Sequence, residues 1–152
     1  MDSTFQLSLA RTFARKKVIG LEWHNVIELN HIVSPQRRQR VRDLCQLHVV
    51  YILSFVGSYG RFFRTMHDMW ATGIESIVGR SRCLLCWEKV GPGGKLEYAE
   101  WYQMTVFVED NRDIVEEMQS AGIEVRAVNT HNTTHSHGYE DLLAATEDLL
   151  CS

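Results

Sequence analysis

Two apolar runs of the chain each end abruptly in acidic side chains. Val18–Leu21 is followed by Glu22, and Thr105–Val108 is followed by the pair Glu109 and Asp110. Continuous apolar runs are typical of buried parallel strands, and open α/β sheets bind ligands just outside the carboxyl ends of such strands. Because carboxylate oxygens are ligands of hard cations, the two acidic clusters predict one site that holds a cation, a phosphate group or both.

Strand and helix patterns alternate around these two segments. The predicted strands cover residues 18–21, 49–53, 83–87, 105–108 and 123–128. The first helix is expected to begin at Ser34-Pro35, an N-cap followed by proline at the first helical position. Further helices are predicted near 59–70, 96–102, 114–121 and 139–149. This alternation favours βαβ units, so the expected fold class is α/β: a Rossmann-like three-layer sandwich around a central, mostly parallel five-stranded sheet.

The second predicted helix carries an aromatic stripe. Its members are spaced as one face of an amphipathic helix: Tyr59, Phe62, Phe63, Met66 and Trp70. Because side chains of these types are usually buried, we expect the stripe to pack in the core.

Length and composition fit a single globular domain. The chain has 152 residues, of which 45% are hydrophobic and 23% charged, which is typical of a domain with an ordinary core. The spacing of the four cysteines does not fit a secreted disulfide scaffold, and no apolar run approaches the ~20 residues of a membrane span. We therefore expect an intracellular, cytoplasmic domain over 17–152, preceded by a flexible arm or targeting segment over 1–16.

In their order and spacing, the polar motifs resemble those of haloacid dehalogenase-like (HAD) domains, over residues 17–150. Members of that family carry four motifs at the carboxyl ends of a Rossmann-like sheet. The resemblance implies that Ser54, in Tyr51-Ile-Leu-Ser-Phe55, binds a phosphate oxygen. Phe55 belongs to the same phosphate-binding segment, and amides at Gly57 and Ser58 are candidates to assist because helix-start amides attract anions.

The resemblance also assigns a lysine and an acidic pair. Lys89, in Cys86-Trp-Glu-Lys89, matches the lysine that neutralises phosphoryl charge and keeps the carboxylates ionised, and Lys95 is the second candidate. Glu109 and Asp110 match the acidic pair that binds Mg²⁺ together with waters and phosphate oxygens. Mg²⁺ is therefore the expected cofactor.

The first motif departs from the family pattern. Glu22 occupies the position of the nucleophilic aspartate, and His24 occupies that of the aspartate that acts as general acid and base. The family nucleophile forms an aspartyl-phosphate. The Glu22 side chain is one methylene longer than that aspartate, and ~1 Å of misplacement of a nucleophile can cost ~100-fold in rate. His24 can act in acid–base chemistry near neutral pH, and its backbone carbonyl remains a candidate metal ligand beside Glu22. Val26 lacks the side-chain hydroxyl that the family usually has at its position.

These observations predict a Mg²⁺-dependent phosphate-monoester hydrolase domain with an altered catalytic loop and weak or absent activity. The alternative is a non-catalytic pseudophosphatase that binds Mg²⁺ with phosphate or a phosphorylated macromolecule. The segments after Val26 and after Lys89 are too short for a cap domain. By the same resemblance, a capless domain implies large phosphorylated partners, although a small phosphate ester remains open.

Two other kinds of site are weighed against this one. Cys83-x-x-Cys86 with His131, His135 and His137 offers zinc ligands, but residues three apart on a strand face opposite sides, so we do not expect zinc. The arginine-rich run at 37–42 is interpreted as a solvated helix face. The formal net charge is −3, unlike the basic footprint of nucleic-acid binders, so nucleic acid is not an expected partner.

Overall fold

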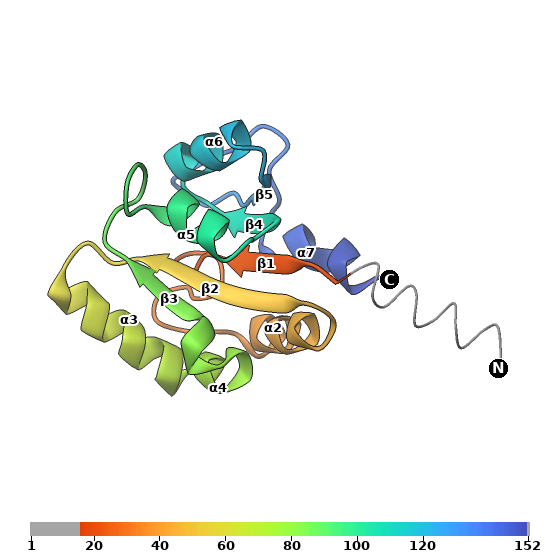
Figure 1. Ribbon diagram of the computed structural model, residues 1–152. Helices are drawn as coiled ribbons and strands as arrows, with labels where there is room; N and C mark the ends of the chain where they lie inside the picture. Colours follow the sequence, from red (N-terminus) through yellow and green to blue (C-terminus); the bar gives the residue numbers. More distant parts are fainter. Residues whose placement is uncertain (1–15, 152) are drawn as a thin grey trace, which may run out of the picture.

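Five parallel strands form the centre of the molecule. The computed structural model describes residues 16–151, and the predicted arm at 1–16 falls almost wholly outside them. The strands stand in the order β3-β2-β1-β4-β5, and every neighbouring pair is parallel (Figure 1). Their bounds are β1 Val18–Leu21, β2 Val49–Phe55, β3 Cys83–Cys86, β4 Val106–Glu109 and β5 Glu124–Ala127. The predicted α/β fold is confirmed, and the sheet is wholly parallel.

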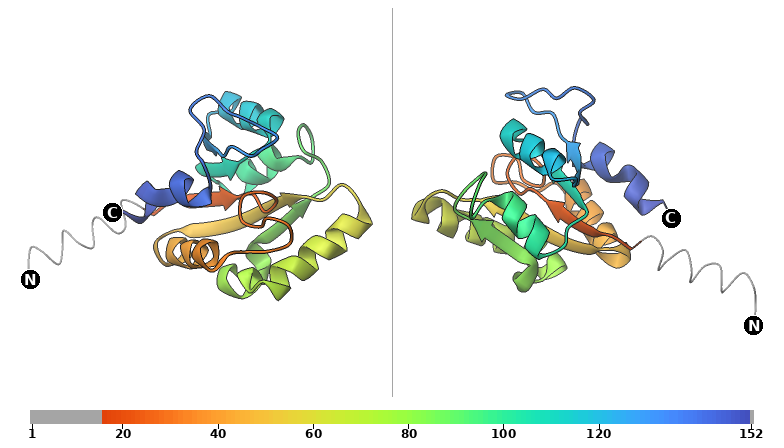
Figure 2. Two further views of the ribbon diagram at one scale, coloured as in Figure 1. Left: turned by 180° about the vertical axis from the view of Figure 1, so that it is seen from behind. Right: turned by 45° about the horizontal axis from the view of Figure 1, so that its top comes forward.

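Helices cover both faces of the sheet, as the two views of Figure 2 also show. The layer on one face contains α2, α4 and α7, and α2 contacts the other two. The layer on the other face contains α5 and α6, which contact each other. Each layer has its own apolar core cluster. The helices are α2 Pro35–Leu47, α3 Tyr59–Ala71, α4 Ile74–Val78, α5 Lys95–Trp101, α6 Arg112–Ser120 and α7 Leu142–Leu150.

The connections around the sheet are short. The segment from β1 to α2 spans 22–34 and the segment from β3 to α5 spans 87–94, so neither holds a further domain and the expected absence of a cap is confirmed for the described residues. Residues 16–151 contain no helix with the length and hydropathy that crossing a bilayer requires.

The aromatic stripe of α3 does not pack as the sequence predicted. The buried residues of this helix are Thr65 and Met69, whereas Tyr59 is 75% exposed and Phe63 and Trp70 are each 65% exposed. The core prediction is therefore wrong for these three rings. α3 lies at the β3 side of the sheet (Figure 1) and packs mainly on α4, so much of its apolar face has no sheet beneath it.

The solvated face predicted for the arginines of α2 is confirmed for Arg42, which is exposed, but is wrong for the other three. Arg37 donates to the Ile27 carbonyl at 2.6 Å and Arg38 to the Thr72 carbonyl at 2.8 Å. Arg40 donates to the Leu143 carbonyl of α7 at 2.6 Å. These side chains hold loops and helices together, which leaves them unavailable as a basic patch.

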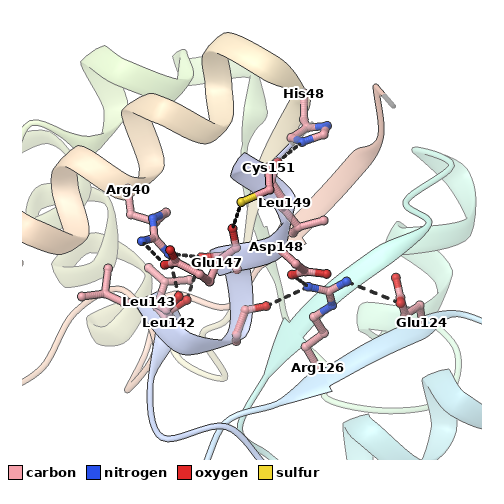
Figure 3. A network of polar contacts seen from close by, with 12 residues as sticks. Arg40, His48, Glu124, Arg126, Leu142, Leu143, Glu147, Asp148, Leu149 and Cys151 are labelled. Carbon is pink, nitrogen blue, oxygen red and sulfur yellow. Dashed lines mark hydrogen bonds and ion pairs between the residues drawn. The ribbon is translucent and has the colours of Figure 1, made fainter. Parts of the chain in front are cut away.

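The closing helix α7 is tied to both of its neighbours by polar contacts (Figure 3). The Nε2–H of His48 donates to the Leu149 carbonyl at 2.8 Å, while its Nδ1 accepts the Lys17 amide at 3.0 Å. Arg126 of β5 donates to the Ala145 carbonyl at 3.0 Å and forms an ion pair with Asp148. α7 therefore joins the start of β1, the end of α2 and the edge strand β5.

Candidate functional site

Four charged side chains from three separate segments meet at the carboxyl edge of the sheet. The Lys95 Nζ lies 2.6 Å from Glu109 Oε1 and forms a second ion pair with Glu22 Oε2. Asp110 completes the group, since ligand oxygens of Glu22, Glu109 and Asp110 all lie within 4.8 Å of one another. Lys95 is 1% exposed and Glu109 is fully buried, so these are charges inside the protein.

The strands and one tight turn place these residues. Glu22 directly follows β1, and its amide donates to the Val108 carbonyl of β4 at 3.0 Å. Glu109 ends β4, and its Oε2 accepts the Asp110 and Asn111 amides at 3.0 and 3.2 Å. Lys95 is the first residue of α5, which begins directly after the glycine-rich turn at 91–94.

Burial shifts the pKa of two members of the cluster. Desolvation lowers the pKa of Lys95, while the nearby Glu109 carboxylate acts to raise it. Burial, together with the charge of Glu109, raises the pKa of Asp110 to about 7. A site that holds more carboxylates than cations stabilises an added cation, because the opposite charge favours the ionised acids.

The donor set fits a hard divalent cation. Mg²⁺ binds oxygen ligands and commonly uses one or two carboxylates plus waters and phosphate oxygens. The Lys95 ammonium takes one oxygen each of Glu22 and Glu109, and the other Glu22 oxygen, Oε1, accepts the His24 amide at 2.9 Å. The Asp110 carboxylate is the acid least engaged by these contacts, so it is the natural first ligand.

His24 is held beside Glu22 by a second carboxylate. Its Nδ1 lies 3.3 Å from Glu28 Oε1, and Glu28 Oε2 accepts the His31 amide at 2.7 Å. Burial acts to raise the pKa of Glu28, but hydrogen bonds from His24 and His31 bring it below its ordinary value. The His24 Nε2 is buried and finds no hydrogen-bond partner within the described part of the chain. Sequence reasoning missed Glu28, although its i+4 spacing from His24 was visible.

Ser54 ends the apolar part of β2 at the same edge of the sheet. Ser54 is fully buried, and among residues 16–151 its Oγ has no hydrogen-bond partner, which is costly for a hydroxyl unless a ligand or water satisfies it. Phe55 follows as the last residue of β2. The amide of Ser58 donates to the Val56 carbonyl at 2.6 Å and its hydroxyl caps α3, so Ser58 is already engaged.

Lys89, the preferred lysine of the sequence analysis, does not join the carboxylates. It is exposed, and its Nζ lies 5.2 Å from the centroid of the Phe55 ring. Lys95, the second candidate, occupies the position between Glu22 and Glu109. The signal that favours Lys95 is the glycine-rich turn before it, because a helix that starts after such a turn begins at the carboxyl edge of a parallel sheet.

The zinc ligands considered from the sequence do not come together. Cys83 packs against the core cluster beneath α2 and α4, whereas Cys86 belongs to the cluster beneath α5 and α6, so the two thiols face opposite sides of β3. Burial raises the pKa of both thiols to about 12. The ring Nε2 of His135 instead donates to the Asp110 carbonyl at 2.7 Å.

The chain matches no protein-family model and no curated protein sequence. Its chemistry therefore has to be argued from the site itself. The arrangement offers oxygen ligands for a cation, a buried ammonium for an anion, and an unpaired hydroxyl at the same edge.

Proposed function

We propose that this chain is a HAD-type phosphohydrolase domain that binds Mg²⁺ together with a phosphate monoester and hydrolyses the ester slowly or not at all. One observation carries the proposal: Glu22, Lys95, Glu109 and Asp110 converge from three separate segments at the carboxyl edge of a parallel sheet. Ligands of open α/β sheets bind at this edge. The placement agrees with the motif order from which the resemblance was drawn.

Each residue has a role in this proposal. The Asp110 carboxylate and the backbone carbonyl of His24 would hold the cation, and the Glu22 carboxylate would join them by exchanging one of its present contacts for the ion, which would offset phosphate charge and orient its oxygens. The Lys95 ammonium attracts the phosphoryl group, and the Ser54 hydroxyl donates to one phosphate oxygen. A bound phosphate would thus satisfy the Ser54 Oγ, which is buried and unpaired.

The catalytic loop supports binding better than hydrolysis. Both carboxylate oxygens of Glu22 are engaged, one by Lys95 and one by the His24 amide, and the side chain is only 5% exposed. A nucleophile needs an oxygen free to attack in line with phosphorus, and reactivity falls steeply with misplacement. The second candidate function, hydrolysis through Glu22, is favoured by the position of this carboxylate directly after β1, where the family nucleophile stands.

Binding and turnover can be separated in one set of experiments. We expect isothermal titration calorimetry to show that phosphate binds more tightly with Mg²⁺ than with EDTA, and that Asp110→Asn removes this gain. We expect p-nitrophenyl phosphate to be hydrolysed slowly or not at all by the wild type, and faster after Glu22→Asp with His24→Asp. No Mg²⁺-dependent phosphate binding by the folded wild type would refute the proposal.

A further inference from the structure

Three aromatic rings, two of them exposed and one half-buried, contact one another at the start of α3 and the end of β3. The rings of Phe62 and Trp87 are stacked, with centroids 5.6 Å apart and an interplanar angle of 10°. Tyr59 meets Trp87 edge-on at 5.2 Å. Tyr59 is 75% exposed and Trp87 is 41% exposed. We refer to Tyr59, Phe62 and Trp87 as the aromatic platform.

The platform lies at the same edge of the sheet as the phosphate-binding candidates. Tyr59 is the first residue of α3, and Trp87 directly follows β3. Parallel strands end at one edge, and β3 pairs with β2, which carries Ser54 and ends at Phe55. The Lys89 Nζ, two residues beyond Trp87, lies over the Phe55 ring. The platform and the phosphate-binding candidates therefore lie beyond the carboxyl ends of neighbouring strands of one sheet.

The chemistry of this surface is aromatic and cationic. Exposed rings in contact with one another present apolar area that a folded protein rarely leaves open without use. Lys89 and Arg61 are exposed, and within residues 16–151 neither side chain forms an ion pair. Exposed rings flanked by unpaired cations are the combination that binds nucleotides, because bases stack on rings and phosphates meet positive charge.

We propose that the phosphate ester bound by this chain is a nucleoside monophosphate, whose base stacks on the aromatic platform while its phosphate occupies the site of Ser54 and Lys95. This inference rests on the proposed function. Ser54 lies within β2, whereas Tyr59 begins α3 and Trp87 follows β3, so a ligand that contacts both needs a spacer between its phosphate and its ring. A nucleotide has its ribose between phosphate and base, whereas an aryl phosphate attaches its ring directly to the phosphate oxygen.

Calorimetry in the presence of Mg²⁺ tests this inference with matched ligands. Adenosine 5′-monophosphate and ribose 5-phosphate share the phosphate and the sugar and differ by the base. We expect the nucleotide to bind about tenfold more tightly, a gain typical of one stacked base. Tyr59→Ala and Trp87→Leu should each remove most of that gain and leave the affinity for ribose 5-phosphate unchanged.

The control variant is Trp101→Ala, because Trp101 is 81% exposed but lies at the end of α5, outside the platform; it should keep the full gain. A 5′-phosphorylated single-stranded oligonucleotide that binds more tightly than the mononucleotide would identify a strand end as the source of the ligand, and equal binding would identify free nucleotides. Equal affinities for the nucleotide and ribose 5-phosphate, or a gain in affinity seen only with a phosphotyrosine peptide, would overturn the nucleotide inference but leave the proposed function standing. Failure of every phosphate ligand to bind would instead overturn the proposed function beneath it.

Discussion

Lys95 is the residue on which the buried charge cluster depends. Its ammonium forms ion pairs with both Glu22 and Glu109, and all three side chains are at most 5% exposed. Removing one partner of a buried ion pair leaves an uncompensated charge, which costs far more than the pair itself contributes. This single side chain is therefore the shared ion-pair partner of two buried carboxyl groups.

The corresponding prediction compares two lysines. Lys95→Met should lower the free energy of unfolding by about 3–5 kcal/mol, because two buried carboxylates lose their cation. Lys89→Met, at an exposed position, should change it by less than about 0.5 kcal/mol. Urea unfolding followed by circular dichroism measures both, and equal effects of the two substitutions would contradict the buried cluster.

Asp110 predicts how stability depends on pH when no metal is present. Burial and the Glu109 charge raise its pKa from 3.8 to about 7, so the folded state holds this proton more tightly than the unfolded state. The contribution of Asp110 is therefore most favourable below about pH 4 and is lost as pH rises through about 7. In EDTA, the stability of the wild type relative to Asp110→Asn should fall across this window. A difference that stays constant with pH would show that Asp110 titrates normally.

Some residues of the candidate site can be predicted from the sequence, and others cannot. Glu109 and Asp110 were found because two acids directly after an apolar strand are visible without any tertiary information. Lys95 was ranked below Lys89 because the choice depends on where α5 begins, and strand and helix ends are the least certain part of a pattern. Glu28 was missed because its role comes from loop geometry, which places its carboxylate against the His24 ring.

At the level of single elements, β1 is packed tightly against side chains from the neighbouring strand β4 and the segment before it. A Cβ at Gly20 would lie 2.4 Å from the Phe107 ring and 2.6 Å from the Met104 sulfur. This close approach lets Phe107 of β4 pack across β1. Because Glu22 follows two residues later, the same packing fixes where its carboxylate stands.

Two glycine substitutions test this fit. Gly20→Ala should destabilise the protein by about 1–3 kcal/mol, because overpacking forces neighbouring side chains to move. Gly60→Ala is the matched control: it lies in α3, its Cβ would meet nothing within 4 Å, and alanine favours the helix by roughly 0.5–1 kcal/mol. Thermal melts of the two variants should shift in opposite directions, and a neutral Gly20→Ala would contradict the packing described.

The elements were predicted better than the surfaces that they present. Strand and helix positions followed from hydrophobic spacing, but spacing alone does not say how much sheet lies beneath a helix. α3 packs near the edge strand β3, so Tyr59 and Phe63 remain exposed although their spacing is that of a buried face. The short helix α4 was not predicted because its five residues, between Gly73 and Gly79, span too little chain for a helical period.

For the molecule as a whole, the parallel sheet brings distant charges to one edge, and that edge defines the proposed function. Ligands that bind the folded state raise its apparent stability by mass action. Mg²⁺ with phosphate should therefore raise the melting temperature of the wild type more than either alone, and Asp110→Asn should lose the combined effect. Equal shifts in the two proteins would place the ions elsewhere.

The central claim is that one edge of the sheet holds a cation and a phosphate group together, and a crystal structure grown with Mg²⁺ and phosphate tests it most directly. We expect Mg²⁺ bound to carboxylate oxygens of Glu22 and Asp110 at about 2.1 Å, and a phosphate oxygen within hydrogen-bond distance of the Ser54 hydroxyl. An edge without either ion, with Lys95 still paired to both Glu22 and Glu109 and the Ser54 hydroxyl unpaired, would contradict it.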